Sequence, residues 1–341
     1  MLMLKLHPWH LPKSTSPDSR YREMFNRSQL TPEYFLLTGL PGLEAHYPWF
    51  IFPFCSTYLV ALVGNSLILV VIKKSTSLHQ PMYLFLAMLA FAELGVSVST
   101  LPTVLGIFLL GASEISFAAC LLQMFSIHSF SIMESGVLLA MSVDRFVAIY
   151  NPLRYTAILT VPRIVGTGAA LGLKSVILMF PLPFLLKRLP FCGHKVLSHS
   201  YCLHSDLIQL PCGDTRPNSI LGLCIVTSTF GLDSLLIVIS YVLILYTVLG
   251  ITSGEGRRKA LNTCVSHICA VLVYYVPMIS VALVHRFMKH AAPAVGLLLA
   301  NVYLLVPPVL NPIIYSVKTK QIRQGLIHLF ASKEIIRGQC Q

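Results

Sequence analysis

Charged side chains inside long apolar segments are the residues of this sequence whose types and spacing could do chemistry. Asp144 and Arg145 are adjacent in the stretch MSVDRFVAIYNPLRY, where a nearly uncharged apolar segment ends. Glu93 and Glu134 each lie inside a similar apolar segment. An ionisable group surrounded by hydrocarbon is costly, so each is a functional candidate that needs a partner.

A second group of reactive side chains combines cysteines with histidines. One polar stretch contains Cys192, Cys202 and Cys212 interleaved with His194, His199 and His204, and Cys120 begins an apolar segment. Disulfides and a metal site are both compatible with this pattern. Four cysteines permit three disulfide pairings, and an oxidising compartment favours disulfides over a metal.

No motif for catalysis accompanies these residues. The sequence has no HExxH helix, no nucleophile elbow and no glycine-rich phosphate loop between a strand and a helix. We therefore expect a protein that is not an enzyme and that uses no cofactor.

Composition places the chain in a membrane. It is 55% hydrophobic and 11% charged, and its mean hydropathy is +0.74. Ordinary soluble domains are roughly a quarter charged. The net charge of +12 lies between apolar segments rather than on one soluble face, which argues against nucleic acid as a partner.

Seven segments are long enough to cross a bilayer, which requires about 20 mainly apolar residues each. Lipid offers no partner to backbone groups, and segments of this length form helices. The expected fold is an all-α, seven-helix membrane bundle with spans at 49–72, 82–106, 121–149, 163–186, 219–249, 261–284 and 294–316.

The sequence does not assign a role to several residues inside these spans. Lys174 and Asp233 lie in spans four and five, and the sequence offers no evident partner for either. Prolines at 277, 307, 308 and 312 interrupt helix hydrogen bonding in spans six and seven, which suits helices that pivot. Proline is also simply commoner in membrane helices than in soluble ones.

Lysine and arginine in the short loops predict the orientation, because they concentrate on the cytoplasmic side. The loops after spans one, three and five, with the tail, carry twelve such residues, and the opposite loops carry six. The sequon NRS at Asn26, a glycosylation acceptor, and the loop cysteines both fall on the predicted outer side. We expect a multi-pass plasma-membrane protein whose N-terminus is outside.

The predicted organisation has three parts. Residues 1–48 form an extracellular tail, 49–317 the seven-span domain, and 318–341 a cytoplasmic amphipathic helix and tail. The N-terminus lacks the apolar core of a signal peptide, and Met24 is an alternative start.

Six motifs occur in chain order, about one for each span. They are GN at 64–65, PMYLFLAMLAFAEL from Pro81, MSVDRFVAIYNPLRY from Met141, SYVLIL from Ser240, KALNTCVSHI from Lys259 and NPIIY from Asn311. Together they resemble the odorant (olfactory) receptors, a branch of the rhodopsin-like G-protein-coupled receptors, over about residues 30–330. FLLTGLPGLE, the loop LPFCGHKVLSHSYCLHSD and VHRF resemble the class I, fish-like subgroup and its family 51.

The chain departs from the family pattern at a few positions. Val143, Phe146 and Tyr150 replace two tyrosines and a cysteine of the usual M-A-Y-D-R-Y-V-A-I-C, and Glu93 stands where aspartate is usual. The key charges are kept. The missing hydroxyl at Phe146 raises the question of whether the Asp144–Arg145 pair is held less firmly.

The resemblance implies how the outer side is built. It implies a disulfide between Cys120 and Cys202, which leaves Cys192 and Cys212 as candidates for a second bridge. The expected ligand is a small odorant, a carboxylic acid or another polar volatile, held by Arg286, His128 and Ser205. A guanidinium suits a bidentate grip on a carboxylate. An interfacial role for Arg286 and a core role for His128 are the alternatives.

The resemblance also implies how a signal reaches the inner side. The partner is a heterotrimeric G protein of the olfactory or stimulatory type, which raises cyclic AMP. The residues implied in coupling and activation are Asp144, Arg145, Tyr241, Asn311, Pro312 and Tyr315. A metabolite-sensing receptor of the same fold and a membrane transporter are the rival functions, and the absence of an internal repeat argues against a transporter.

A polar chamber inside the bundle completes the implied machinery. Asn65, Glu93, Glu134 and Asn311 could converge there, where related receptors hold a sodium ion. A protonated, hydrogen-bonded carboxyl pair without an ion is the alternative, because close like charges disfavour double ionisation.

Overall fold

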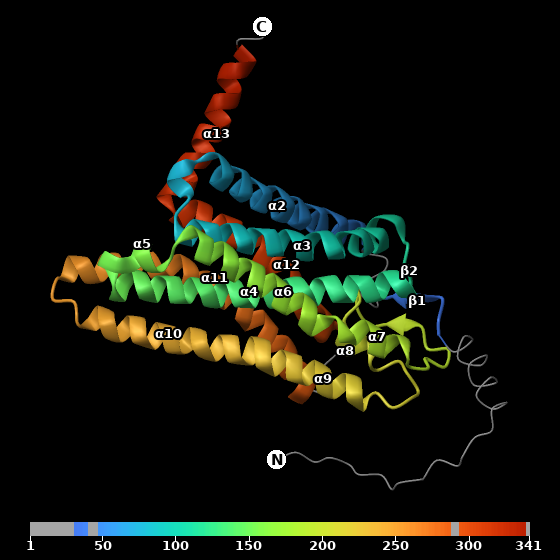
Figure 1. The fold of residues 1–341 in the computed structure, drawn as a ribbon. Helices are drawn as coiled ribbons and strands as arrows, with labels where there is room; N and C mark the ends of the chain where they lie inside the picture. The colour runs from blue at the N-terminus through green and yellow to red at the C-terminus, as the bar shows by residue number, and fades with distance from the viewer. Residues whose placement is uncertain (1–30, 40–46, 288–292, 339–341) are drawn as a thin grey trace.

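Seven long helical segments lie side by side in the computed structural model, which describes residues 31–39, 47–287 and 293–338 (Figure 1). Five are single helices: α2 (Tyr47–Lys74), α3 (Pro81–Leu110), α4 (Phe117–Tyr150), α11 (Gly254–Phe287) and α12 (Pro293–Lys318). The other two are composite. One joins α6 (Val161–Met179) to α7 (Pro181–Lys187), and the other joins α9 (Arg216–Val226) to α10 (Leu232–Leu249). The seven-helix prediction is confirmed.

The two composite segments break in different ways, and only the first break follows from a proline. Pro181 lacks the N–H that would continue α6, so a new helix begins there. Between α9 and α10, residues Thr227–Gly231 form a π-helical stretch, η4, which widens the helix by one residue. The predicted spans did not foresee this stretch.

Six of these segments are long and apolar enough to cross a membrane, and α4 is not among them. The reason is its position, because α4 packs against α3, α6, α10 and α11. It can therefore carry Glu134, Asp144 and Arg145 among serines without exposing them to lipid. A hydropathy test fails where most of a helix is covered by protein, as for α4.

The outer helices show the opposite pattern. In α6 the buried residues are Ile164, Gly168, Ser175 and Met179, and in α10 they are Asp233, Ile237, Ile244 and Val248. Both sets follow the spacing i, i+4, i+11, i+15, which forms a single stripe on one helix face. The rest of each helix exposes large apolar side chains, as a lipid-facing helix does.

A three-stranded sheet closes one end of the bundle, called here the sheet end. Its order is β2 (Glu114–Ser116), β1 (Tyr34–Leu37) and β3 (Val196–Leu197), with β1 antiparallel to β2 and parallel to β3. The fully buried Phe35 ring packs at 5.6 Å from Phe117 and 5.5 Å from Phe191. The all-α prediction did not include this sheet, because its short strands come from loops that are far apart in the sequence.

At the opposite end, the α13 end, short elements link the helices. They are η2 (Thr76–Leu78), η3 (Pro152–Arg154) and α5 (Tyr155–Ile158). The longer helix α13 (Lys320–Gly338) follows α12 at the same end. Figure 1 shows α13 turning away from the bundle axis. Ile322 is fully buried while Arg323 and Gln324 are exposed, so α13 has an apolar side and a polar side.

Gly95 marks a close approach of α3 to α4, and it supplies a test of this packing. A Cβ at Gly95 would lie 2.5 Å from the Phe130 ring, whereas one at Gly166 on α6 would meet nothing within 4 Å. Overpacking costs about 1–3 kcal/mol, and glycine-to-alanine in a helix gains about 1 kcal/mol. We expect Gly95→Ala to lower the melting temperature of the purified protein and Gly166→Ala to leave it level or raised. Equal melting temperatures for the two variants would contradict this packing.

Candidate functional site

Two disulfides fix the long loop at the sheet end. Cys120, in the first turns of α4, is joined to Cys202 with 5.5 Å between their Cα atoms. Cys192 is joined to Cys212 within the loop, with a Cα separation of 6.0 Å. The first is the pair that the family resemblance implies, and the second joins the two cysteines that it left over. Within its described residues, no group of three or more His, Cys, Asp or Glu side chains could hold a metal.

A small cavity of about 50 Å³ lies beside this loop. Its walls come from α4, the α6–α7 segment, the α9–η4 segment and the short helix α8 (His204–Leu207). The lining is His128, Ile132, Met179, Leu182, His204, Gly222, Ile225, Val226 and Phe230. Two imidazoles are the polar groups of a lining that is otherwise apolar and aromatic.

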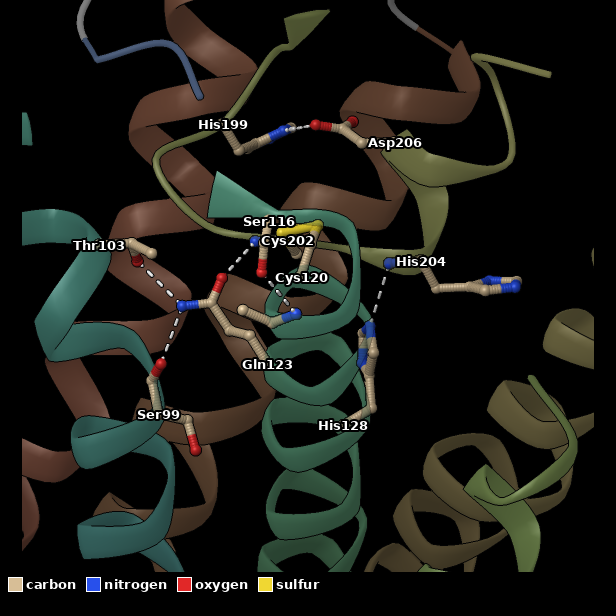
Figure 2. Close-up of a disulfide and its surroundings, with 11 residues drawn as sticks. Ser99, Thr103, Ser116, Cys120, Gln123, His128, His199, Cys202, His204 and Asp206 are labelled. Carbon is tan, nitrogen blue, oxygen red and sulfur yellow. Dashed lines mark hydrogen bonds and ion pairs between the residues drawn. A yellow bond between two sulfur atoms is a disulfide. The ribbon is translucent and has the colours of Figure 1, made fainter. Parts of the chain in front are cut away.

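The two histidines of this cavity are connected. The backbone N–H of His204 donates to His128 Nε2 at 3.3 Å, as Figure 2 shows. An accepting Nε2 places the proton of a neutral His128 on Nδ1. Burial lowers the pKa of His204 from 6.5 to about 4, so His204 is uncharged near neutral pH. His204 was missed as a ligand candidate, because only the fold brings it opposite His128.

The other two predicted ligand residues are placed differently. Ser205 is exposed on α8 and is not part of the cavity wall, so the structure does not bring it to His128. Arg286 lies in the last turn of α11, at the sheet end, but its side chain is outside the described part of the chain. Asn26 is also outside the described residues.

The predicted polar chamber is assembled between α2, α3, α4 and α12. Asn311 Nδ2 donates to Glu93 Oε1, and Glu134 is buried within electrostatic reach of Glu93. Among the described residues, Glu93 Oε2 and Glu134 Oε1 have no hydrogen-bond partner. A sodium ion or a shared proton would each satisfy these oxygens.

Asn65 donates to a carbonyl of α12 that has no helical donor because of Pro312. Proline has no N–H, so the carbonyl of Pro308, four residues earlier on α12, loses its helical donor. Asn65 Nδ2 donates to that carbonyl at 2.9 Å. A Cβ at the neighbouring Gly64 would lie 3.0 Å from Pro312, which shows how closely α2 approaches there.

Lys174 and Asp233, which had no evident partner in the sequence, pair with each other. Lys174 Nζ on α6 is 3.9 Å from Asp233 Oδ1 on α10. Ser135 on α4 donates to Asp233 Oδ2 at 2.8 Å and is 2.8 Å from the hydroxyl of Tyr275 on α11. This network joins four helices. Ser135 and Asp233 each lie three residues after a cavity-lining residue, Ile132 and Phe230.

Asp144 and Arg145 form an ion pair at the α13 end. Arg145 Nε donates to Asp144 Oδ2 at 2.8 Å, and the Tyr155 hydroxyl donates to Oδ1 at 2.7 Å. Both carboxylate oxygens are therefore occupied. Phe146, the residue without the usual hydroxyl, instead stacks on Tyr150 at 5.3 Å between ring centroids. Tyr155 lies in the quoted NPLRY stretch, but its role follows only from the fold.

A large cleft of about 640 Å³ opens beside this ion pair. Arg145 and Tyr315 line it, and basic side chains at its mouth come from Arg258, Lys259, Lys318 and Lys320. Tyr241 on α10 contacts His267 on α11, whose Nε2 lies 3.1 Å from the Leu138 carbonyl on α4. Since a carbonyl only accepts, Nε2 carries the proton and the Tyr241 hydroxyl donates to Nδ1.

Comparison with known proteins gives a consistent result. A sequence profile of the olfactory receptor family matches residues 54–333. Human olfactory receptor 51I2 is 56% identical over 299 residues, which cover 88% of this chain and 96% of that protein. Human olfactory receptor 51G2 is 56% identical over 305 residues, covering 89% and 97%.

A solved structure supports the fold independently. The crystal structure of squid rhodopsin superimposes with a TM-score of 0.69, covering 87% of this chain and 90% of that one, at 19% identity. At that identity the match concerns the fold alone. The family match over most of the length decides the rest: the chain belongs to the olfactory receptor family of seven-helix G-protein-coupled receptors, which are receptors and not enzymes.

Proposed function

We propose that this receptor binds a small carboxylic acid or another polar volatile from outside the cell and signals through a stimulatory or olfactory G protein that raises cyclic AMP. The observation that carries the proposal is the cavity roofed by His204. At about 50 Å³ it is far smaller than the roughly 300–1,000 Å³ of drug-sized sites. It therefore suits a ligand of few atoms.

The chemistry of the cavity favours a molecule with one polar end. His128 and His204 supply imidazole groups, while Ile132, Met179 and Leu182 supply apolar surface for an alkyl chain. Arg286, in the last turn of α11 at the same end of the bundle, supplies the positive charge that a carboxylate needs.

The basic residues support an orientation with the sheet end outside. The α13 end contains Lys73 and Lys74 in the last turn of α2, Arg154 in η3, Lys318 in the last turn of α12 and Lys320 at the start of α13. Positive residues concentrate on the cytoplasmic side of membrane proteins. The cleft beside Arg145 then faces the cytoplasm, where a G-protein helix could enter it.

Activation would follow from a population shift. A ligand that binds the state with a wider cleft more tightly moves the equilibrium toward that state. Asp144 holds Arg145 in the described state, and release of this pair frees the guanidinium for the partner.

Removing the proposed carboxylate anchor provides the first test of function. In cells with a cyclic AMP reporter, we expect Arg286→Ala to raise the half-maximal concentration of an active carboxylic acid about ten- to a hundredfold, since a charge-assisted contact contributes about 1.5–3 kcal/mol. Arg216→Ala, at an exposed arginine of the same end, should leave the response unchanged. An unchanged response in Arg286→Ala at equal surface delivery would refute the anchor.

The contact between Tyr155 and Asp144 predicts basal activity. Tyr155→Phe removes the hydroxyl that donates to Asp144, and a lost bond of about 1 kcal/mol raises the active fraction about fivefold. Cyclic AMP without ligand should rise accordingly. The matched control is Tyr150→Phe, because the Tyr150 side chain is 65% exposed. If both variants match the unmutated receptor, Tyr155 does not restrain Asp144.

The lowered pKa of His204 predicts a pH effect on stability. The folded-state pKa of about 4 lies below the ordinary 6.5, so the unfolded chain binds the proton more readily. Stability is then full above pH 6.5 and falls as the pH drops toward 4, by about 2 kcal/mol at pH 5. Between pH 7 and pH 5, the melting temperature of His204→Gln should drop less than that of the unmutated protein.

The control for this pH effect is His194→Gln, at an exposed histidine of the same loop. It should keep the full drop in melting temperature. Identical pH profiles for His204→Gln and the unmutated receptor would show that His204 titrates normally.

A further inference from the structure

We infer that Gln123 is a positioning residue that fixes the loop segment Cys202–His204 as the roof of the cavity and so sets how tightly a ligand is held. Gln123 lies on α4, one turn after the cystine residue Cys120, and its side chain is 7% exposed. It does not line the cavity. Its effect on a ligand therefore has to pass through the loop.

The side-chain amide of Gln123 makes three hydrogen bonds, two to α3 and one to the loop. Nε2 donates to the Ser99 carbonyl at 2.8 Å and to Thr103 Oγ1 at 2.9 Å, both on α3. Oε1 accepts from the backbone N–H of Cys202 at 2.9 Å (Figure 2). The amide thus connects α3 through α4 to the loop.

The chemistry of the partners fixes the orientation of that amide. The Ser99 carbonyl can only accept and the Cys202 N–H can only donate. A flipped amide would lose both bonds at once. Gln123 therefore presents its oxygen to the loop in one defined orientation, set by α3.

Three attachments to α4 hold the roof segment. Cys202 is bound through the disulfide to Cys120 and through its N–H to Gln123, and the N–H of His204 is bound to His128. Leu203 between them has an extended backbone, with φ −108° and ψ 144°. In such a backbone alternate N–H groups point the same way, so one helix face can bind both.

The disulfide alone does not define this geometry, because rotation about its bonds lets the backbone of Cys202 turn. Gln123 stops that rotation by binding the peptide itself. Two residues later the His204 ring lines the cavity, and a Cβ at Gly222 would come within 2.8 Å of it. With so little room, a small turn at Cys202 displaces the imidazole.

The first arm of the test needs no ligand. Gln123→Leu keeps the bulk of the side chain and leaves the buried Cys202 N–H without its acceptor. In the purified full-length receptor, we expect backbone amides of residues 198–207 to exchange hydrogen about tenfold faster than in the unmutated protein, as for a local opening eased by one buried bond. Unchanged exchange would overturn the inference.

Two further variants keep this arm decisive. Thr103→Val removes one acceptor of the amide without touching the loop, and should speed exchange by a smaller factor in the same segment. Gln209→Leu changes an exposed glutamine of the same loop, which bonds the Ser205 carbonyl at 2.9 Å, and should leave residues 198–204 unchanged. If Gln123→Leu fails to fold, Thr103→Val decides.

The second arm measures the effect on binding, and it rests on the proposed function. With straight-chain carboxylic acids from acetate to decanoate, Gln123→Leu should raise the half-maximal concentration about tenfold at equal surface delivery, and Gln209→Leu should not. In a His204→Asn background the shift should disappear, because the side chain through which Gln123 acts is gone.

The outcomes separate the two hypotheses. Equal shifts with and without His204 would overturn the role of Gln123 in positioning that ring. If the unmutated receptor gives no cyclic AMP response to any of these acids, the proposed ligand class is wrong. The exchange measurement alone then tests the positioning role of Gln123.

Discussion

Every polar group buried in this bundle has to be satisfied by another part of the chain, because lipid offers no hydrogen-bond partner. Some buried side chains meet this constraint within their own helix, as Thr229 does, and others with a bond that joins two helices. Asn65 replaces the donor that Pro312 lacks, Asn311 binds Glu93, and Ser135 binds Asp233. Since each bond joins two helices, the polar residues define which helix faces meet. The apolar surface alone would allow many rotations.

The same constraint explains why α4 is the central helix. Its Ser131, Ser135, Asp144 and the Leu138 carbonyl bind partners on other elements. A helix that carries so many polar groups is stable in a membrane only if other helices surround it. The polar residues of α4 therefore require its central position, and that position allows them. The lipid-facing α6 and α10 bury only one stripe each.

Sequence patterns predict the parts of this fold that depend on local length and composition. The seven helices and their order follow from apolar runs, and the Cys120–Cys202 disulfide follows from family motifs. The pairing of Lys174 with Asp233, the role of Tyr155 and the opposition of His128 and His204 do not follow, because each depends on which helix faces meet. The sheet depends on contacts more than 75 residues apart, as between Tyr34 and Ser116. No local signal encodes such contacts.

The bonds between α4 and α11 indicate how much work a ligand must do. The Tyr274 hydroxyl donates to the Ser131 carbonyl at 2.7 Å, Tyr275 meets Ser135, and His267 donates to the Leu138 carbonyl. These bonds lie at three successive levels of α4, so separating α11 from α4 along its length breaks them all. At about 1 kcal/mol each they oppose opening by about 3 kcal/mol, or roughly 150-fold. A ligand of few atoms can supply that difference only if it binds the two states very differently.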